Sequence, residues 1–119
     1  MSITQILSDF SSAIRLDTLP PEVVTRARFL MLDLVGNMVR ARVDAESTPA
    51  LFAAAQALGL DRGDCAVFGE ARGWSPAGAA MLNGVLAHSL DFDDTHAAGS
   101  LHPGAPVIPA ALAAGEMAG

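Results

Sequence analysis

Residues 75–90, with the sequence SPAGAAMLNGVLAHSL, decide the fold. Serine followed by proline is a typical helix start, because the serine oxygen accepts a hydrogen bond from a free backbone N–H and proline fits the first turn. Small side chains recur through the run and let neighbouring backbones approach closely; they are Ala77, Gly78, Ala79, Ala80, Gly84 and Ala87. We therefore expect this helix to lie at the centre of a bundle.

The residues before this run also follow helical patterns. Apolar side chains recur at three- and four-residue spacing over residues 3–15 and again over residues 23–39. The Ser-Thr-Pro sequence at 47–49 predicts a further helix start, and Gly59 predicts the end of that helix after an alanine-rich stretch.

The rest of the chain differs in character. Residues 61–75 contain three glycines around a short apolar run, which predicts a loop with at most one short strand near residues 65–68. A last helix is expected to begin between Gly104 and Pro109 and to run to the end of the chain. Together these patterns predict an all-α chain of about five helices, in which residues 1–119 form a single, incomplete helical domain.

The composition excludes several classes of protein. The chain has 119 residues, of which 51% are hydrophobic, and long runs of charge are absent, so general disorder is excluded. Its 13 acids outnumber its seven basic residues, all of them arginine, and the formal net charge is −6. A nucleic-acid binder needs a basic face, which this chain cannot easily build. We expect no nucleic-acid partner.

The cysteine content and the hydropathy of the chain indicate its cellular compartment. The lone Cys65 cannot form an internal disulfide and is expected to be a small buried apolar side chain. The first ten residues lack the basic and apolar regions of a signal peptide. Two uncharged stretches, 73–90 and 95–115, lack the apolar density of a membrane-spanning helix. We expect a cytoplasmic chain with no membrane partner.

Polar side chains suited to chemistry gather in one window, residues 88–102. They are His88, Asp91, Asp93, Asp94, Thr95, His96 and His102. If the preceding helix continued for one more turn, Asp91 and Thr95 would share a face. His102 precedes Pro103, which favours an extended backbone close to the start of the last helix. A carboxylate, a hydroxyl and an imidazole at one place would suit general acid–base catalysis.

Other interpretations of the window remain open. His88 lies on the Met81–Val85 face of its helix, so it is expected to be a satisfied core histidine. Asp93 and Asp94 are short acids of the kind that end helices or form turns. The carboxylates together with His96 could hold a hard divalent ion, but the spacing matches neither an EF-hand loop nor an HExxH motif, so no metal is expected.

Several segments resemble one known family. The segment HSLDFDDTH at residues 88–96 is followed after five residues by HPG at 102–104 and then by PAALA at 109–113. LPPEVV at 19–24 and LDLVG at 32–36 extend the pattern toward the N-terminus. Together they resemble the MmgE/PrpD family, which includes 2-methylcitrate dehydratase, cis-aconitate decarboxylase and iminodisuccinate epimerase. The resemblance runs through essentially the whole chain, in order.

The resemblance implies that this chain is part of an enzyme. It implies the N-terminal portion of a large all-helical domain whose active site lies against a smaller lid domain, in a homodimer that uses no metal and no organic cofactor. Carried over by position, the catalytic residues would be Asp91, Thr95 and His102. Thr95 would hydrogen-bond a substrate carboxylate, and Asp91 would position or polarise a neighbour. His102 would transfer the proton or assist the residue that does.

The resemblance covers only the N-terminal portion of family members. By this resemblance, residues 1–119 are expected to lack the lid domain, together with a further histidine and the lysines that the family brings to the pocket. A small di- or tricarboxylate substrate needs cationic partners, whereas this chain has an excess of acids and no lysine. We therefore expect part of a 2-methylcitrate dehydratase-like lyase, which removes a proton next to a carboxylate with loss of water or CO2 and is inactive alone.

Two alternatives stay open beside the lyase. One is a non-catalytic helical module that serves in association, and the other, with less support, is a protein that binds a divalent metal. The sequence does not choose among dehydratase, decarboxylase and epimerase. Because an incomplete bundle leaves an apolar face uncovered, the chain is expected to associate with itself or with a missing C-terminal part.

Overall fold

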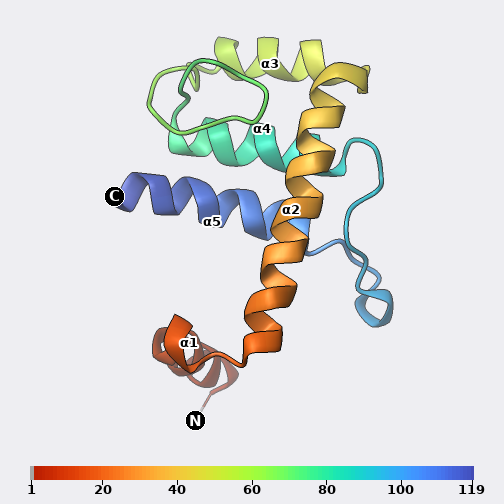
Figure 1. The fold of residues 1–119 in the computed structure, drawn as a ribbon. Helices are drawn as coiled ribbons and strands as arrows, with labels where there is room; N and C mark the ends of the chain where they lie inside the picture. Colours follow the sequence, from red (N-terminus) through yellow and green to blue (C-terminus); the bar gives the residue numbers. More distant parts are fainter. Residues whose placement is uncertain (1) are drawn as a thin grey trace.

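Five α-helices make up most of the computed structural model, which describes residues 2–119 (Figure 1). Helices α4 (Pro76–His88) and α5 (Gly104–Ala118) lie side by side, and the long α2 (Pro21–Asp44) crosses both. Helix α3 (Thr48–Ala57) packs on the opposite side of α4 from α5, while α1 (Ile3–Ala13) lies at the far end of α2. The prediction of an all-α chain with about five helices is confirmed.

Helix α4 occupies the centre, as its small residues predict. Ala79, Leu82, Leu86 and Ala87 have no exposed surface. The helix begins as expected, because the Ser75 hydroxyl oxygen accepts a hydrogen bond from the backbone N–H of Gly78 at 3.0 Å. It ends at His88 and not at Leu90, two residues earlier than the pattern predicts.

The core joins α2, α3 and α4 to the loop between α3 and α4. Leu34 and Met38 from α2 are fully buried, and so is Trp74 from the loop. The Trp74 ring meets Phe52 of α3 edge to face, with ring centroids 5.5 Å apart. Cys65 is buried in the same cluster, which confirms its expected role as a small apolar side chain.

Backbone and side-chain hydrogen bonds fix the loop. Cys65 and Trp74 exchange two backbone hydrogen bonds of 3.0 and 2.9 Å, which form an isolated bridge at the place where at most one short strand was expected. Buried Asn83 on α4 accepts from the N–H of Phe68 and donates to the carbonyl of Ala66. Glu116 of α5 is exposed and also accepts from the N–H of Ala66 at 2.8 Å.

Helix α2 differs from its prediction in two ways. It extends to Asp44, beyond the expected end near Val39, and none of its residues before Leu34 is fully buried. Its buried residues are Leu34, Met38 and Ala41, so the apolar stripe that includes Met31 is covered only in part. The spacing of apolar residues shows which face of a helix is apolar, but it does not show whether another element covers that face.

Helix α3 begins at Thr48, where the Ser-Thr-Pro sequence predicts a helix start, but it lacks a side-chain cap. Ser47 takes an α-helical backbone conformation and its side chain makes no capping hydrogen bond. The neighbouring Thr48 hydroxyl donates to the carbonyl of Ala41 at 2.9 Å, so it ties α3 to the end of α2. The end of α3 is as expected, since Gly59 follows it with a positive φ of 71°.

Helix α1 is amphipathic, as predicted, yet every one of its residues is exposed. Its apolar stripe therefore faces solvent in this chain. No helix within residues 2–119 combines the length and the apolar character needed to cross a membrane.

Candidate functional site

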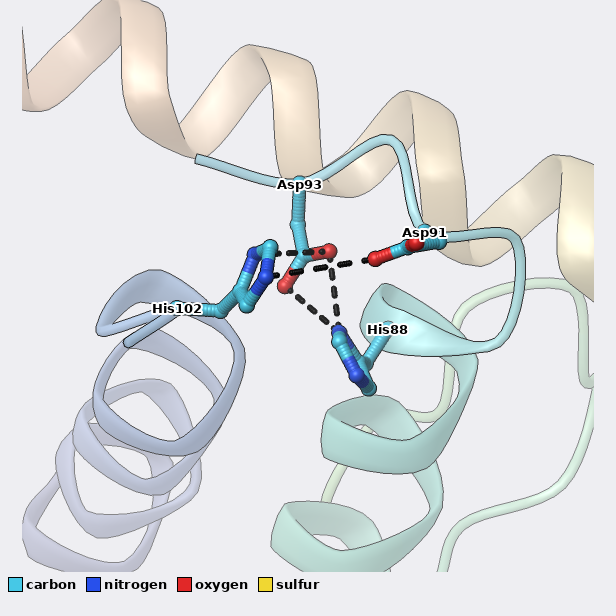
Figure 2. Close-up of side chains that lie close together, drawn as sticks. All are labelled: His88, Asp91, Asp93 and His102. Carbon is cyan, nitrogen blue, oxygen red and sulfur yellow. Dashed lines mark hydrogen bonds and ion pairs between the residues drawn. The ribbon is translucent and has the colours of Figure 1, made fainter. Parts of the chain in front are cut away.

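Four polar side chains converge where α4 ends and α5 begins (Figure 2). His88 is the last residue of α4, and His102 stands just before α5. Asp91 and Asp93 belong to the turn between these helices. One nitrogen or oxygen from each side chain lies within 4.8 Å of the others, so three separate segments of the chain meet at a single point.

Asp93 is the centre of this cluster. Its side chain is fully buried, and both of its carboxylate oxygens lie 3.0 Å from Nδ1 of His88. Its Oδ1 also lies 3.5 Å from Nδ1 of His102. An ionised carboxylate can only accept hydrogen bonds, so it directs a ring N–H of His88 toward itself and leaves the opposite nitrogen, Nε2, free for other partners.

The two imidazole rings face each other across Asp93. Their centroids are 4.9 Å apart and their planes are tilted by 56°. Figure 2 shows both rings pointing toward the carboxylate, His88 from the end of α4 and His102 from the loop just before α5. A shared carboxylate therefore fixes the orientation of two imidazole rings, a residue type that often serves in proton transfer.

Asp91 sits on the open side of the cluster. Its side chain is 80% exposed, and its Oδ1 lies 3.9 Å from Nε2 of His102. The residue adopts a left-handed conformation with φ 55°, and its N–H donates to the carbonyl of His88 at 3.0 Å. This turn ends α4, so Asp91 and Thr95 do not share the face of a continued helix.

The structure brings together two of the three predicted catalytic residues, Asp91 and His102. Thr95 is exposed and makes no hydrogen bond within residues 2–119. Asp94 is not part of the cluster and accepts from the N–H of Gly104, and His96 accepts from the N–H of Gly99. These last two residues stabilise the loop.

For two members of the cluster, the structural role expected from the sequence is wrong. His88 was expected in the core, but half of its side chain is exposed and it pairs with Asp93. Asp93 was expected to end a helix or form a turn, but its carboxylate contacts the two imidazoles. The five-residue separation of His88 and Asp93 matches no helical spacing, so the sequence carries little sign of their contact.

A pocket of about 630 Å³ adjoins the cluster. His88 and His102 lie on its wall, and the rest of the wall is mostly apolar. The other lining residues, from α4 and α5 and their ends, are Ala80, Met81, Gly84, Val85, Ser89, Ala105 and Pro106. None of the residues lining the pocket is an arginine, so a bound anion would meet imidazoles as the only groups there that can become positive. Such a surface can exchange a proton with a bound molecule, but it offers little charge to hold an anion.

Comparisons with known proteins agree with the motif. Residues 5–119 match the family model described as the MmgE/PrpD N-terminal domain. The chain is similar to the cis-aconitate decarboxylase-like protein oryM of Aspergillus oryzae (strain ATCC 42149 / RIB 40), with 32% identity over 98% of this chain and 24% of the relative. It is also similar to cis-aconitate decarboxylase of Aspergillus terreus, with 30% identity over 97% of this chain and 23% of the relative. No solved structure gives a significant match. The chain thus spans about a quarter of the length of these relatives.

Proposed function

Because the chain belongs to the MmgE/PrpD family, we propose that it supplies the proton-transfer part of a lyase site for small di- and tricarboxylates. The reaction removes a proton next to a carboxylate with loss of water or CO2. The observation that carries the proposal is the pair of imidazoles, His88 and His102, held by buried Asp93 at the edge of a pocket.

His102 is the proposed proton-transfer residue. Two carboxylates flank its ring, Asp93 at Nδ1 and Asp91 at Nε2, and they limit the orientations that the ring can take. A positioned general acid or base contributes typically about 10²- to 10⁴-fold to a rate. Asp91 has the positioning role that the family resemblance assigns to it.

Thr95 is the proposed contact for a substrate carboxylate. Its hydroxyl is exposed and engages no other group within residues 2–119, which leaves it available for this role. It lies outside the four-residue cluster, so a substrate would have to span the distance between Thr95 and the pocket.

Charge limits what this chain does alone. The formal net charge is −6, and two of the acids stand in the cluster itself, so a polycarboxylate is repelled. We propose that positive side chains from another polypeptide segment or from a second subunit complete the site, in a homodimer. On this view the isolated chain has no measurable turnover.

A chimeric enzyme tests the catalytic proposal. Residues 5–119 of this chain replace the matching segment of Aspergillus terreus cis-aconitate decarboxylase, which provides the remaining three quarters of the polypeptide. Two substrates are tested, cis-aconitate and 2-methylcitrate. The first is chosen because the relative is named as a cis-aconitate decarboxylase. The measured quantities are CO2 release and loss of water, and circular dichroism confirms folding.

The matched variants are His102→Gln and His96→Gln. His102→Gln is expected to lower kcat by about 100-fold or more, whereas His96→Gln changes it little because that ring only caps a loop. Equal kcat values for the two variants would overturn the role of His102. If the full exchange does not fold, a graft of residues 88–104 carries the same pair of substitutions.

A second candidate function, a helical association module, is supported by α1 and α2. All of α1 is exposed, and so are Phe29 and Leu32 in the N-terminal half of α2. Large contiguous apolar surface marks association sites. A chimera that folds, assembles and has no activity with either substrate would favour this alternative.

A further inference from the structure

The outward face of α2 carries an exposed apolar seam. Its positions alternate at three- and four-residue spacing, as in a heptad pattern; they are Phe29, Leu32, Gly36, Val39 and Val43. We propose that this seam docks a helix from the part of the MmgE/PrpD fold that lies beyond the matched residues 5–119. The proposal rests on the family membership and not on the lyase reaction.

The seam lies on the side of α2 opposite the core. Leu34 and Met38 are fully buried, and Gly36 stands midway between them in sequence. Because an α-helix turns by about 100° per residue, two residues in either direction lead to the opposite face. Leu32 and Val43 on that face are 68% and 81% exposed. A helix that is apolar on both faces is normally buried between two layers, so a second layer is expected over the seam.

A groove runs along the seam and has a glycine in its middle. Its volume is about 450 Å³, and its lining residues are Leu32, Val35, Gly36, Val39, Arg40 and Val43. Glycine is one of the two least favourable residues inside a helix. A Cβ atom on Gly36 would meet no atom within 4 Å, so no contact within residues 2–119 requires glycine there. A closely packed helix would require it, because the missing side chain lets two backbones approach.

The pattern of the seam also describes the helix that would occupy it. Heptad spacing favours a second helix that crosses at only about 20°, with charged side chains flanking the apolar contact. Arg40 beside the seam pairs with Asp44 of the same helix. Arg28, on the other flank, forms no ion pair within residues 2–119. The occupant is therefore expected to be an amphipathic helix with an acidic side chain near Arg28.

The size of the seam argues against a second copy of this chain as the occupant. A stable interface between proteins uses about 20–30 residues on each side, whereas the seam offers five positions. This chain spans 24% and 23% of two relatives, so about three quarters of each relative lies outside the match. A helix within so large a polypeptide is also held by contacts elsewhere, which gives it a high effective concentration at the seam.

Gly36→Leu tests the seam in two settings, this chain alone and the chimera with Aspergillus terreus cis-aconitate decarboxylase. In the chain alone, the melting temperature should stay unchanged or rise by about 3 °C, because leucine favours a helix and has open space there. In the chimera it should fall by about 3 °C or more, because the added side chain meets the docked helix. An equal shift in both settings would overturn the proposal.

A thiol on the seam reports directly whether the seam is covered. Val39→Cys should react with a maleimide at least about tenfold more slowly in the chimera than in this chain, where Val39 is 48% exposed. Cys65 is buried, so the two proteins without the substitution give the background labelling. Equal rates in both settings would contradict the docked helix. Protection already in this chain that is lost on dilution would show a second copy on the seam and would also overturn the proposal.

The two readouts are independent of catalysis. A chimera that folds but has no activity still reports on the seam, because neither the melting temperature nor the labelling rate measures turnover. If the full exchange does not fold, a graft of residues 28–44 alone carries the same two substitutions.

Discussion

The Asp94 carboxylate accepts a hydrogen bond from the backbone N–H of Gly104 at 3.0 Å. Gly104 is the first residue of α5, where backbone N–H groups have no partner inside the helix. A Cβ atom on Gly104 would lie 2.1 Å from Oδ1 of Asp94 and 2.8 Å from Cδ1 of Leu34. The cap and the packing of α5 on α2 therefore both require glycine at this position.

Replacement of Gly104 by alanine should lower the free energy of unfolding by about 2–4 kcal/mol, because it displaces the capping carboxylate and overpacks the helix start. Urea unfolding followed by circular dichroism measures the loss. Gly115→Ala is the matched control in the same helix, since a Cβ there meets no atom within 4 Å. It should be neutral or stabilising by up to about 1 kcal/mol. Similar values for both variants would contradict this account of Gly104.

Asn83→Leu should destabilise the loop that follows α3. It removes the hydrogen bonds to Phe68 and Ala66, which leaves a backbone donor and acceptor without their partner at a cost of about 2–3 kcal/mol. The chain has one tryptophan, Trp74, and it is buried within this loop, so a red shift of its fluorescence would report the change. Asn37→Leu serves as the control, because the amide nitrogen of Asn37 is buried without a partner within residues 2–119. An unshifted spectrum and unchanged stability for Asn83→Leu would count against the proposed anchoring.

The helices could be predicted from the sequence because their determinants are local. Ser75 caps α4 from the adjacent residue, and Gly59 ends α3 through its own backbone conformation. The central position of α4 could be predicted from its small side chains, because they all belong to one continuous helix. Such features need no knowledge of distant segments.

The cluster could be predicted only in part, because its contacts are not local. Asp91 and His102 were recognised as residue types suited to catalysis, but their proximity depends on how α5 returns along α4. The roles of His88 and Asp93 were missed for the same reason. Asp93 is buried by the packing of α2, α4 and α5, which short-range patterns do not encode.

Cys65 should make stability depend on pH in the alkaline range. Burial raises the pKa of its thiol, with further contributions from Glu116 and Asp64. The folded state therefore keeps the thiol proton at pH values where the unfolded chain loses it, so the free energy of unfolding should fall as pH rises above about 8.5. The chain contains no lysine and no tyrosine, so no other side chain titrates in this window.

Comparison with Cys65→Ala isolates the thiol contribution. Urea unfolding at several pH values between about 8 and 10 should show a steeper decline for the natural chain than for the variant. The smaller side chain of alanine changes the free energy of unfolding by the same amount at every pH, so it does not affect the slope of that free energy against pH. Parallel lines for the two proteins would exclude a raised pKa at Cys65.

The exposed stripe of α1 should drive self-association of the isolated chain. Ile6 and Phe10 are 52% and 66% exposed, and they lie on the apolar side of a helix in which every residue is exposed. Phe10→Asp should shift sedimentation toward the monomer. It should change the free energy of unfolding by less than about 0.5 kcal/mol, because the side chain is already in water. Ser11→Asp adds the same charge one residue away, off the stripe, and should leave the association intact. If the natural chain sediments as a single sharp monomer, or if both variants dissociate it equally, the stripe is not the associating surface.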